Sequence, residues 1–261
     1  MRISLIVTTY NRPDALFLVL KSIKNQRVKP YEVIIADDGS DNQTKEVIDG
    51  FSSASELNLI HSYQEDNGFR VAESRNKAIS IAKGEYIILA DGDMLLHTEF
   101  IHDHAINAQK GFYIQGSRVL LSKIKTQEVL VNKTILFHFF QTGLKNRLNS
   151  IHSSFLSNIF TTHSNQLKGV RTCNMSFFKK NCIDVNGFNM EFKGWGREDS
   201  EFVARLFNSG IIRKTIKFAA VQYHLWHKES NRKLLNENDQ LLLKAVDENL
   251  NWCEHGINKF L

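Results

Sequence analysis

The chain has 261 residues, of which 42% are hydrophobic and 23% charged, and its formal net charge is +5. These values are ordinary for a soluble globular protein with a sizeable core, and the lack of any run approaching 18 apolar residues excludes a membrane-spanning helix. The mild basic excess suits an anionic small molecule, an anionic membrane surface or nucleic acid, without choosing among them.

Cys173, Cys182 and Cys253 are scattered, odd in number and without C-x-x-C spacing. We therefore expect a reducing compartment and no structural zinc. The apolar run 3–7 is too short for the core of a secretory signal, and polar residues follow it. Together these features predict a cytoplasmic protein.

The first part of the chain predicts alternating strands and helices from its apolar runs and helical spacings. Strands are expected at 3–9, 32–37, 57–63 and 86–90, and helices from Pro13, through Val47 and Ile48, and over 70–83. Pro13 suits the first position of a helix, and Gly84 suits a helix end. Because parallel strands need crossovers, this order predicts an α/β fold with a Rossmann-like, mostly parallel sheet and helices on both faces.

The second part of the chain is less regular. Helices are expected over 97–109, at the end of 194–208 and over 231–252, and strands over 112–121, 170–178 and 211–221.

Residues 123–168 mix aromatic residues such as Phe140 and Phe155 with basic ones such as Lys133, and acidic residues are nearly absent. One interpretation is a basic amphipathic helix or mobile lid that contacts a membrane or a lipid-linked acceptor. The other, which we favour, is a set of helices packed on the domain with a basic outer face, since amphipathic helices mostly face a core.

Polar clusters follow three predicted strands, at Thr9–Arg12, Asp37–Ser40 and Asp91–Asp93. Ligands of open α/β sheets bind beyond the carboxyl ends of the strands, so three clusters on one edge predict a nucleotide-sized cleft. The chain has neither G-x-G-x-x-G nor G-x-x-x-x-G-K-[ST], which disfavours a dinucleotide fold and a P-loop enzyme.

Asp91-Gly92-Asp93 places two carboxylates at one strand end with a single glycine between them. Crowding two acids is costly unless a cation neutralises them, which favours a divalent metal that holds a diphosphate. The alternative is an Asp-Gly turn.

Two further motifs carry candidate site residues. Trp195 lies between two glycines, in a loop that exposes an aromatic face to a sugar ring, and Glu198 and Asp199 follow at a helix N-terminus. The helix dipole favours ionised carboxylates there, which suits a general base, although helix capping uses the same residues. His224 and His227 are either structural or metal ligands, and a mixed carboxylate and imidazole site suits Mn²⁺ better than Ca²⁺.

Five motifs occur in one order: Thr8–Arg12, Asp37–Ser40, Arg75-Asn76, Asp91–Asp93 and Gly194–Asp199. In this order the chain resembles glycosyltransferase family 2, inverting enzymes of the GT-A fold. The loop at 194–199, with His227 after it, also resembles the C-terminal half of β-1,4-galactosyltransferases and bacterial chondroitin polymerases. The resemblance extends from Ile3 to about His227, except for 123–168.

The resemblance implies roles for these residues. A uridine pocket is implied for Thr9, Tyr10, Arg12, Asp37 and Asp38, with Arg75 at the diphosphate, Asp91 facing the ribose and metal, and Asn174 and Trp195 near the sugar. It implies Asp93 and His227 as metal ligands, leaves His224 open, and makes Asp199 the base and Glu198 an acceptor-orienting carboxylate. Arg197 departs from the small residue of galactosyltransferases, which puts the sugar specificity in question.

The resemblance also implies one domain over 1–261, with a nucleotide-binding half at 1–95, a smaller mixed donor and acceptor region at 96–230 and a C-terminal helix at 231–261. The implied enzyme uses Mn²⁺ (or Mg²⁺) to move a hexose or N-acetylhexosamine from a UDP-sugar to a glycan or lipid-linked glycan acceptor. It would act in bacterial lipopolysaccharide or capsule synthesis, in the cytoplasm or on the inner face of the membrane.

Three alternatives remain beside this interpretation. A non-catalytic scaffold of a polysaccharide assembly would lack the base or the metal acids, and both are present. A sugar-1-phosphate nucleotidyltransferase would carry a glycine-rich basic loop near its N-terminus, which 8–13 lacks. Nucleic-acid binding is disfavoured, because the basic excess is small and no matching motif is found.

Overall fold

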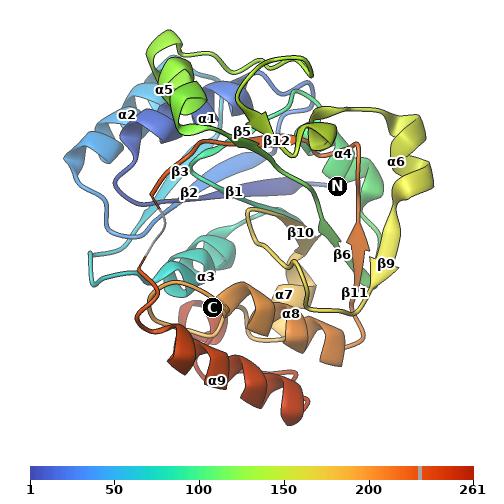
Figure 1. Cartoon of the computed structure of the whole chain (residues 1–261). Coiled ribbons are helices and arrows are strands. Elements are labelled where there is room, and N and C mark those ends of the chain that lie inside the picture. The colour runs from blue at the N-terminus through green and yellow to red at the C-terminus, as the bar shows by residue number, and fades with distance from the viewer. Residues whose placement is uncertain (229–230) are drawn as a thin grey trace.

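The computed structural model describes residues 1–228 and 231–261, and its centre is an eight-stranded sheet within these ranges (Figure 1). The strand order is β3-β2-β1-β4-β10-β6-β11-β9. The bounds are β1 Ile3–Thr9, β2 Glu32–Asp37, β3 Leu59–Tyr63, β4 Tyr86–Asp91, β6 Phe112–Gln115, β9 Thr162–Ser164, β10 Asn174–Phe178 and β11 Ile212–Thr215. The first four strands are parallel, β10 is antiparallel to β4 and β6, and β11 is parallel to β6.

Helices cover both faces of this sheet, as predicted (Figure 1). Leu5 and Val7 point into one core with α1, whereas Ile6 points into the other core with α3 and α8. Since neighbouring residues of a strand face opposite sides, a sheet buried on both faces needs uninterrupted apolar strands. The helix bounds are α1 Pro13–Lys24, α2 Asn42–Ala54, α3 Val71–Ile81, α4 Phe100–Asn107, α7 Lys179–Asp184, α8 Glu198–Asn208 and α9 Leu235–Asp247.

A second, four-stranded sheet forms the smaller mixed region, in the order β5-β12-β7-β8. Its strands are β5 Met94–Leu96, β7 Val119–Leu121, β8 Leu144–Lys145 and β12 Gln222–His224. The single strand predicted at 112–121 is therefore wrong, because β6 and β7 belong to different sheets. The strand predicted at 211–221 is too long, since β11 ends at Thr215 and β12 begins only at Gln222. Gly116 ends β6 against the side chain of Asn174, and the positive φ angles of Phe218 and Ala220 turn the chain after β11.

Other predicted bounds were too wide. The strand predicted at 170–178 begins only at Asn174, and the helix predicted at 97–109 is α4. The terminal helix predicted at 231–252 is confined to α9, and Asn249 turns the chain beyond it with a φ of 51°.

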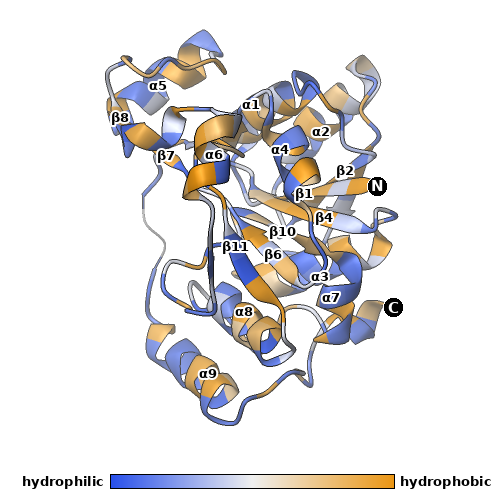
Figure 2. Ribbon diagram, turned by 90° about the vertical axis from the view of Figure 1, so that its right-hand side faces the viewer, coloured by the Kyte–Doolittle hydropathy of each residue, from blue (hydrophilic) through white to orange (hydrophobic). Residues whose placement is uncertain are grey.

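Residues 123–168 form short elements rather than one long helix: α5 Lys123–Asn132, β8, the 3₁₀ turn Arg147–Ser150, α6 Ser154–Phe160 and β9. Val129 and Leu144 are buried in the core, as core-facing packing predicts. Phe140 and Phe155 are nevertheless 86% and 73% exposed, and Figure 2 shows hydrophobic positions along α6. None of the helices in the described part of the chain is both long and apolar enough to cross a bilayer.

Helix α8 contains a buried ion pair whose arginine also holds the chain before the helix. Arg205 contacts both carboxylate oxygens of Glu201, at 2.8 and 2.7 Å, and donates to the carbonyl oxygens of Val185 and Gly187. Both charged side chains are almost fully buried, so each needs the other.

We predict that Arg205→Leu lowers the free energy of unfolding by about 3–5 kcal/mol, because Glu201 is left charged and buried without a partner. Urea denaturation followed by circular dichroism measures the change. The double variant Arg205→Leu with Glu201→Leu removes both charges and should recover most of the loss. A single variant as stable as the original chain would contradict this account.

Candidate active site

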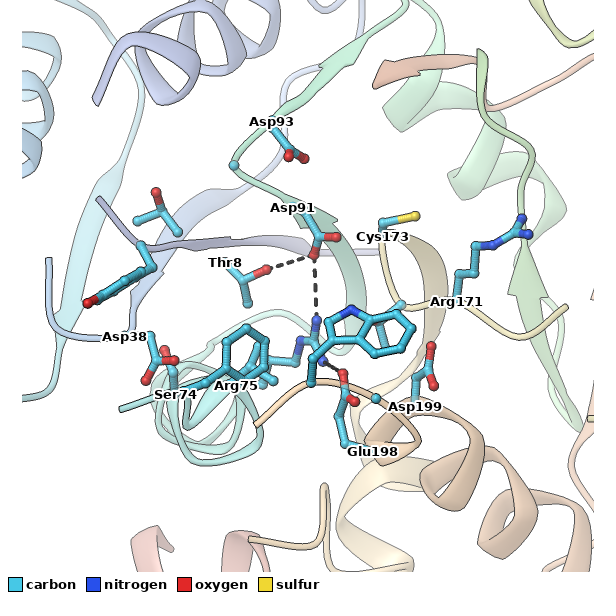
Figure 3. A pocket seen from close by; sticks show the side chains of 18 of the residues that line it. Thr8, Asp38, Ser74, Arg75, Asp91, Asp93, Arg171, Cys173, Glu198 and Asp199 are labelled. Atoms are coloured by element: carbon cyan, nitrogen blue, oxygen red, sulfur yellow. Dashed lines mark hydrogen bonds and ion pairs between the residues drawn. The ribbon is translucent and has the colours of Figure 1, made fainter. Parts of the chain in front are cut away.

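A cleft of about 990 Å³ opens at the carboxyl ends of β1, β2 and β4, opposite the start of α8 (Figure 3). It brings together most of the residues predicted from the sequence. Those that line it are Thr9, Tyr10, Arg12, Asp38, Arg75, Asp91, Asp93, Trp195, Glu198, Asp199 and His227. Asp37, Asn174 and His224 are not among the lining residues.

Asp93, His224 and His227 converge on one point beside the cleft. One ligand atom from each lies within 4.8 Å of the others, and both Nε2 atoms lie 3.4 Å from Asp93 Oδ2. Asp93 Oδ1 is buried without a hydrogen-bond partner among the described residues. A carboxylate with two imidazoles and a spare oxygen fits a divalent transition metal.

Strand pairing produces this convergence. The antiparallel ladder of β5 and β12 sets His224 opposite Met94, and Leu225 N donates to Asp93 O at 3.0 Å. Burial alone would raise the pKa of Asp93, but the hydrogen bond and charge of His224, followed by the charge of His227, hold it below its usual value. The carboxylate is therefore ionised near neutral pH.

Asp91 turns away from that cluster. Its Oδ1 accepts a hydrogen bond from Thr8 Oγ1 at 2.8 Å and lies 3.5 Å from the guanidinium of Arg75. Gly92 lets the chain pass closely between the two acids, since its N donates to Thr8 O at 2.6 Å and a Cβ would meet that oxygen at 2.9 Å. The two acids of the motif therefore have different partners.

The nucleotide side of the cleft is built around Asp38. This carboxylate accepts hydrogen bonds from Gln64 Nε2 at 2.6 Å and Arg70 N at 2.8 Å. Burial raises the pKa of Asp38 to about 6, and the two hydrogen bonds limit the rise. Asp38 is thus mostly ionised at pH 7, as a hydrogen-bond acceptor at the cleft wall.

Two predicted residues support the wall from behind. Asp37 is buried and bonds to His61 Nε2 and Ser40 N, both at 2.8 Å. Asn174 is buried as well, and its Nδ2 donates to Ser117 O and Ala220 O at 2.8 Å. Their side chains hold neighbouring segments in place instead of pointing into the cleft.

The loop before α8 depends on two glycines for its backbone conformation. Gly194 and Gly196 have φ angles of 70° and 106°, in the left-handed region that favours glycine. Asn238 of α9 donates to the carbonyl oxygen of Gly196 at 2.9 Å. Arg197 also has a positive φ, and its Nε donates a hydrogen bond to Oδ1 of Asp239 on α9 at 2.5 Å. Trp195 remains 40% exposed at the cleft.

The first turn of α8 holds a paired and an unpaired carboxylate. Glu198 pairs with Arg75 at 3.1 Å, whereas Asp199 accepts from Ser200 N at 2.7 Å and has no ion pair among the described residues. Burial and then the charge of Glu198 raise the pKa of Asp199 to about 7, although Arg75 lowers it. A carboxylate with this pKa can take and release a proton near neutral pH.

Several cleft residues escaped the sequence analysis. Arg118, Arg171, Lys228 and Arg232 line the cleft, from segments without a recognisable motif. The basic residues around Arg171, directly before β10, are a sequence signal for an anion site. Whether their side chains point into the cleft, however, depends on the tertiary structure.

Comparison with known proteins places the chain among sugar-transferring enzymes. A family model described as glycosyl transferase family 2 matches residues 4–163, and one described as the N-terminal domain of galactosyltransferase matches residues 156–228. A hyaluronan synthase of Pasteurella multocida is 29% identical over 85% of this chain and 24% of its own length. A chondroitin synthase of Escherichia coli is 26% identical over 85% of this chain and 34% of its own.

The fold is similar to that of S. aureus TarS in complex with UDP-GlcNAc. The TM-score is 0.63 at 19% identity, over 88% of this chain and 60% of the other. At this identity the likeness shows the fold alone, and the GT-A fold predicted from the sequence is confirmed. The chain spans about a quarter to a third of the length of the two synthases.

Proposed function

This chain belongs to glycosyl transferase family 2 and is a glycosyltransferase, and from that premise we propose that it is a metal-dependent, inverting enzyme. The proposed reaction moves a hexose or N-acetylhexosamine from a UDP-sugar to a glycan acceptor. One observation carries the proposal: a carboxylate with a pKa of about 7, Asp199, shares a cleft with the cluster of Asp93, His224 and His227. The UDP-GlcNAc named in the TarS structure supports the donor class.

Donor binding follows from the geometry of the nucleotide side. The ionised Asp38 is an acceptor for the N–H of a uracil ring. Tyr10, whose hydroxyl donates to Asp66 at 3.0 Å, offers an exposed aromatic face beside it. Arg75, buried behind Asp91, contributes a positive charge to the floor where a diphosphate would lie. Trp195 offers its exposed ring to the sugar or the acceptor.

Asp93, His224 and His227 would hold Mn²⁺ or Mg²⁺, because one carboxylate oxygen of Asp93 and an imidazole nitrogen of each histidine lie within 4.8 Å of one another. A bound divalent ion supplies positive charge that offsets the charge developing on the departing UDP. Asp91, which has Thr8 and Arg75 as partners, is then left to the ribose side.

The chain's own residues perform the transfer at Asp199. Its carboxylate accepts the proton of an acceptor hydroxyl, and the oxygen forms a bond to the anomeric carbon on the face opposite the nucleotide. The bond from that carbon to the UDP oxygen breaks with its electron pair on UDP, so the configuration inverts. Glu198, held by Arg75, orients the acceptor hydroxyls and keeps the pKa of Asp199 high enough to take the proton.

A non-catalytic scaffold remains the alternative. It would have no need for an unpaired carboxylate with a raised pKa beside a convergent carboxylate and imidazole group. The names of the relatives, a hyaluronan synthase and a chondroitin synthase, support a role in polysaccharide synthesis, and we propose a bacterial surface glycan as the product.

We also propose that residues 123–168 contact the inner face of a membrane. Phe155 and Ile159 lie one turn apart on α6, and both are exposed. Glu128 is the one acid in this segment, and it pairs with Lys125, so the remaining lysines and arginines give a positive excess. Exposed apolar side chains beside cations suit an anionic lipid surface.

We predict that Asp199→Asn lowers kcat by about 10²–10⁴-fold and leaves UDP affinity unchanged, because only the proton acceptor is lost.

We also predict the pH dependence of the unsubstituted protein. Its kcat/KM should rise with pH and level off above the pKa of Asp199, about 7, since only the ionised carboxylate accepts a proton. Glu198→Gln should move this break to lower pH by removing a neighbouring charge. Assays of product formation measure kcat and the pH profile, and calorimetry measures the affinity for UDP. Full turnover by Asp199→Asn would refute the assignment of Asp199 as the base.

We predict that His227→Ala weakens Mn²⁺ binding at least about tenfold, since even outer-shell partners of metal ligands are worth that much. Mn²⁺ titration by electron paramagnetic resonance measures it, and EDTA should abolish UDP-sugar hydrolysis by the original chain. His255→Gln, at an exposed position on the C-terminal segment, is the matched control. Equal Mn²⁺ affinity in both variants would exclude this cluster as the metal site.

We predict that the protein sediments with phosphatidylglycerol vesicles at low salt and less with neutral vesicles or at high salt. Phe155→Ser with Ile159→Ser should reduce binding, because apolar area is lost from the contacting face. Leu243→Ser on α9 removes another exposed apolar side chain, outside this segment, and should have no effect. Absence of binding to anionic vesicles at low salt would favour packing alone.

A further inference from the structure

A second cavity, of about 250 Å³, adjoins the cleft. Arg118 and Arg171 line both spaces, so the two are continuous at these side chains. The cavity lies between β6, β11 and the loop that leads to β10. None of the motifs found in the sequence contributes to it.

The charges of this cavity are all of one sign. Arg118, Lys168, Arg171 and Arg213 line it, and none of its described lining residues is acidic. None of the four forms an ion pair with a described residue. Cations gathered in a partly enclosed space repel one another and lose hydration, which is costly unless an anion joins them.

Arg213 is the cation of this cavity that is buried with uncharged partners alone. It is more than nine-tenths buried, its Nε makes no hydrogen bond of good geometry with a described residue, and the group beside it is the uncharged hydroxyl of Tyr113. Its two other nitrogens donate to Lys168 O at 3.0 Å and Ser164 Oγ at 3.4 Å, both uncharged acceptors. A buried guanidinium without a carboxylate partner indicates that a negative charge belongs nearby.

The backbone around the cavity is held rigidly. Gln115 is buried and clamps the loop, because Arg171 N donates to its Oε1 at 3.1 Å and its Nε2 donates to Arg171 O at 2.9 Å. Asn149 Nδ2 donates to Arg118 O at 2.9 Å. A cavity whose backbone is fixed before binding loses less entropy when a ligand arrives.

Support of the backbone does not explain all four cations. Arg213 does hold the loop through Lys168 O, but the guanidinium of Arg118 contacts only the sulfur of Cys173, at 3.8 Å, within the described chain. The side chain of Arg171 makes no hydrogen bond or ion pair with a described residue and is exposed at the mouth of the cavity. Two guanidinium groups are therefore available to a ligand.

The position of the cavity identifies the side from which that ligand comes. In Figure 3, Arg171 and Asp199 lie on the same side of the cleft, opposite Asp38 and away from Asp93. The donor diphosphate belongs beside Asp93, so an anion at Arg171 is part of the other substrate. Guanidinium groups bind carboxylates and phosphates through paired hydrogen bonds.

We propose that this second cavity binds an anionic group of the acceptor, a uronic acid carboxylate or a phosphodiester, next to the hydroxyl that Asp199 activates. The inference rests on the proposed transferase function. It names a class of acceptor for that function, a charged glycan or a polyol phosphate, and explains why the acceptor would be charged. The anion would set the register of the acceptor, so that one hydroxyl reaches Asp199.

The test compares three acceptors with UDP-GlcNAc as donor: an oligosaccharide with a terminal glucuronate, its carboxyl-reduced counterpart, and an alditol phosphate oligomer. The KM of one anionic acceptor should be about tenfold or more below that of the neutral one, the value of one charge-assisted hydrogen bond. The preferred anion distinguishes carboxylate from phosphate. Arg118→Gln and Arg171→Gln should bring the ratio of the two KM values towards one.

Lys110→Gln removes the same charge from an exposed turn outside both cavities and should leave the ratio as it is. Calorimetry of the same acceptors at low salt needs no turnover. Preference for an anionic acceptor in binding, without transfer of sugar to any acceptor, would overturn the proposed function and keep the anion site. No preference for charge in binding or KM, or a preference that survives both variants, would overturn the inference.

Discussion

The guanidinium of Arg75 joins the two sides of the cleft. It extends from α3, is almost fully buried, and lies 3.1 Å from Glu198 and 3.5 Å from Asp91. Its face also rests on the ring of Phe188, at 5.4 Å. Without this cation two carboxylates from distant segments would face each other across a partly buried space, which is costly. Arg75 thereby fixes the distance between the end of β4 and the start of α8.

The same cation divides the acids of the cleft by function. Asp91 and Glu198 share Arg75, so both are neutralised by a neighbour. Among the described residues, Asp199 has only the N–H and hydroxyl of Ser200 as hydrogen-bond donors, and burial followed by the negative charge of Glu198 raises its pKa to about 7. Carboxylates in different surroundings can therefore take different roles within one site. One arrangement of charge thus explains both the ion pair of Glu198 with Arg75 and the raised pKa of Asp199, on which its proposed role depends.

The charges of the site also differ from one region of the cleft to another. Asp93 lies where two histidines face it, and the arginines 118, 171 and 213 gather around the adjoining cavity, on the side of the cleft where Figure 3 shows Asp199 and Arg171. A donor that carries a diphosphate needs a cation at the first region, and the second region needs an anion. The site is thus suited to two substrates that each bring negative charge, as the proposed function and acceptor require.

The sequence by itself determined the order of strands and helices in the first part of the chain, the three polar clusters at the strand ends, and the loop before α8. These features are local, because periodicity, strand ends and helix starts depend on neighbouring residues. Most residues of those motifs do line one cleft, as the sequence predicted. The second sheet was missed, since three-residue strands such as β5 and β12 are set by their partners more than by their own pattern.

Only the tertiary structure decided which side chains point into the site. It set Asp93 with His224 and His227, turned Asp91 towards Arg75, and buried Asp37 and Asn174 behind the wall. It also gathered arginines from three unrelated segments around one cavity. The physical reason is that contacts between distant segments depend on how sheets pair and pack, and a charged residue reveals its role only when its partners, or their absence, are known.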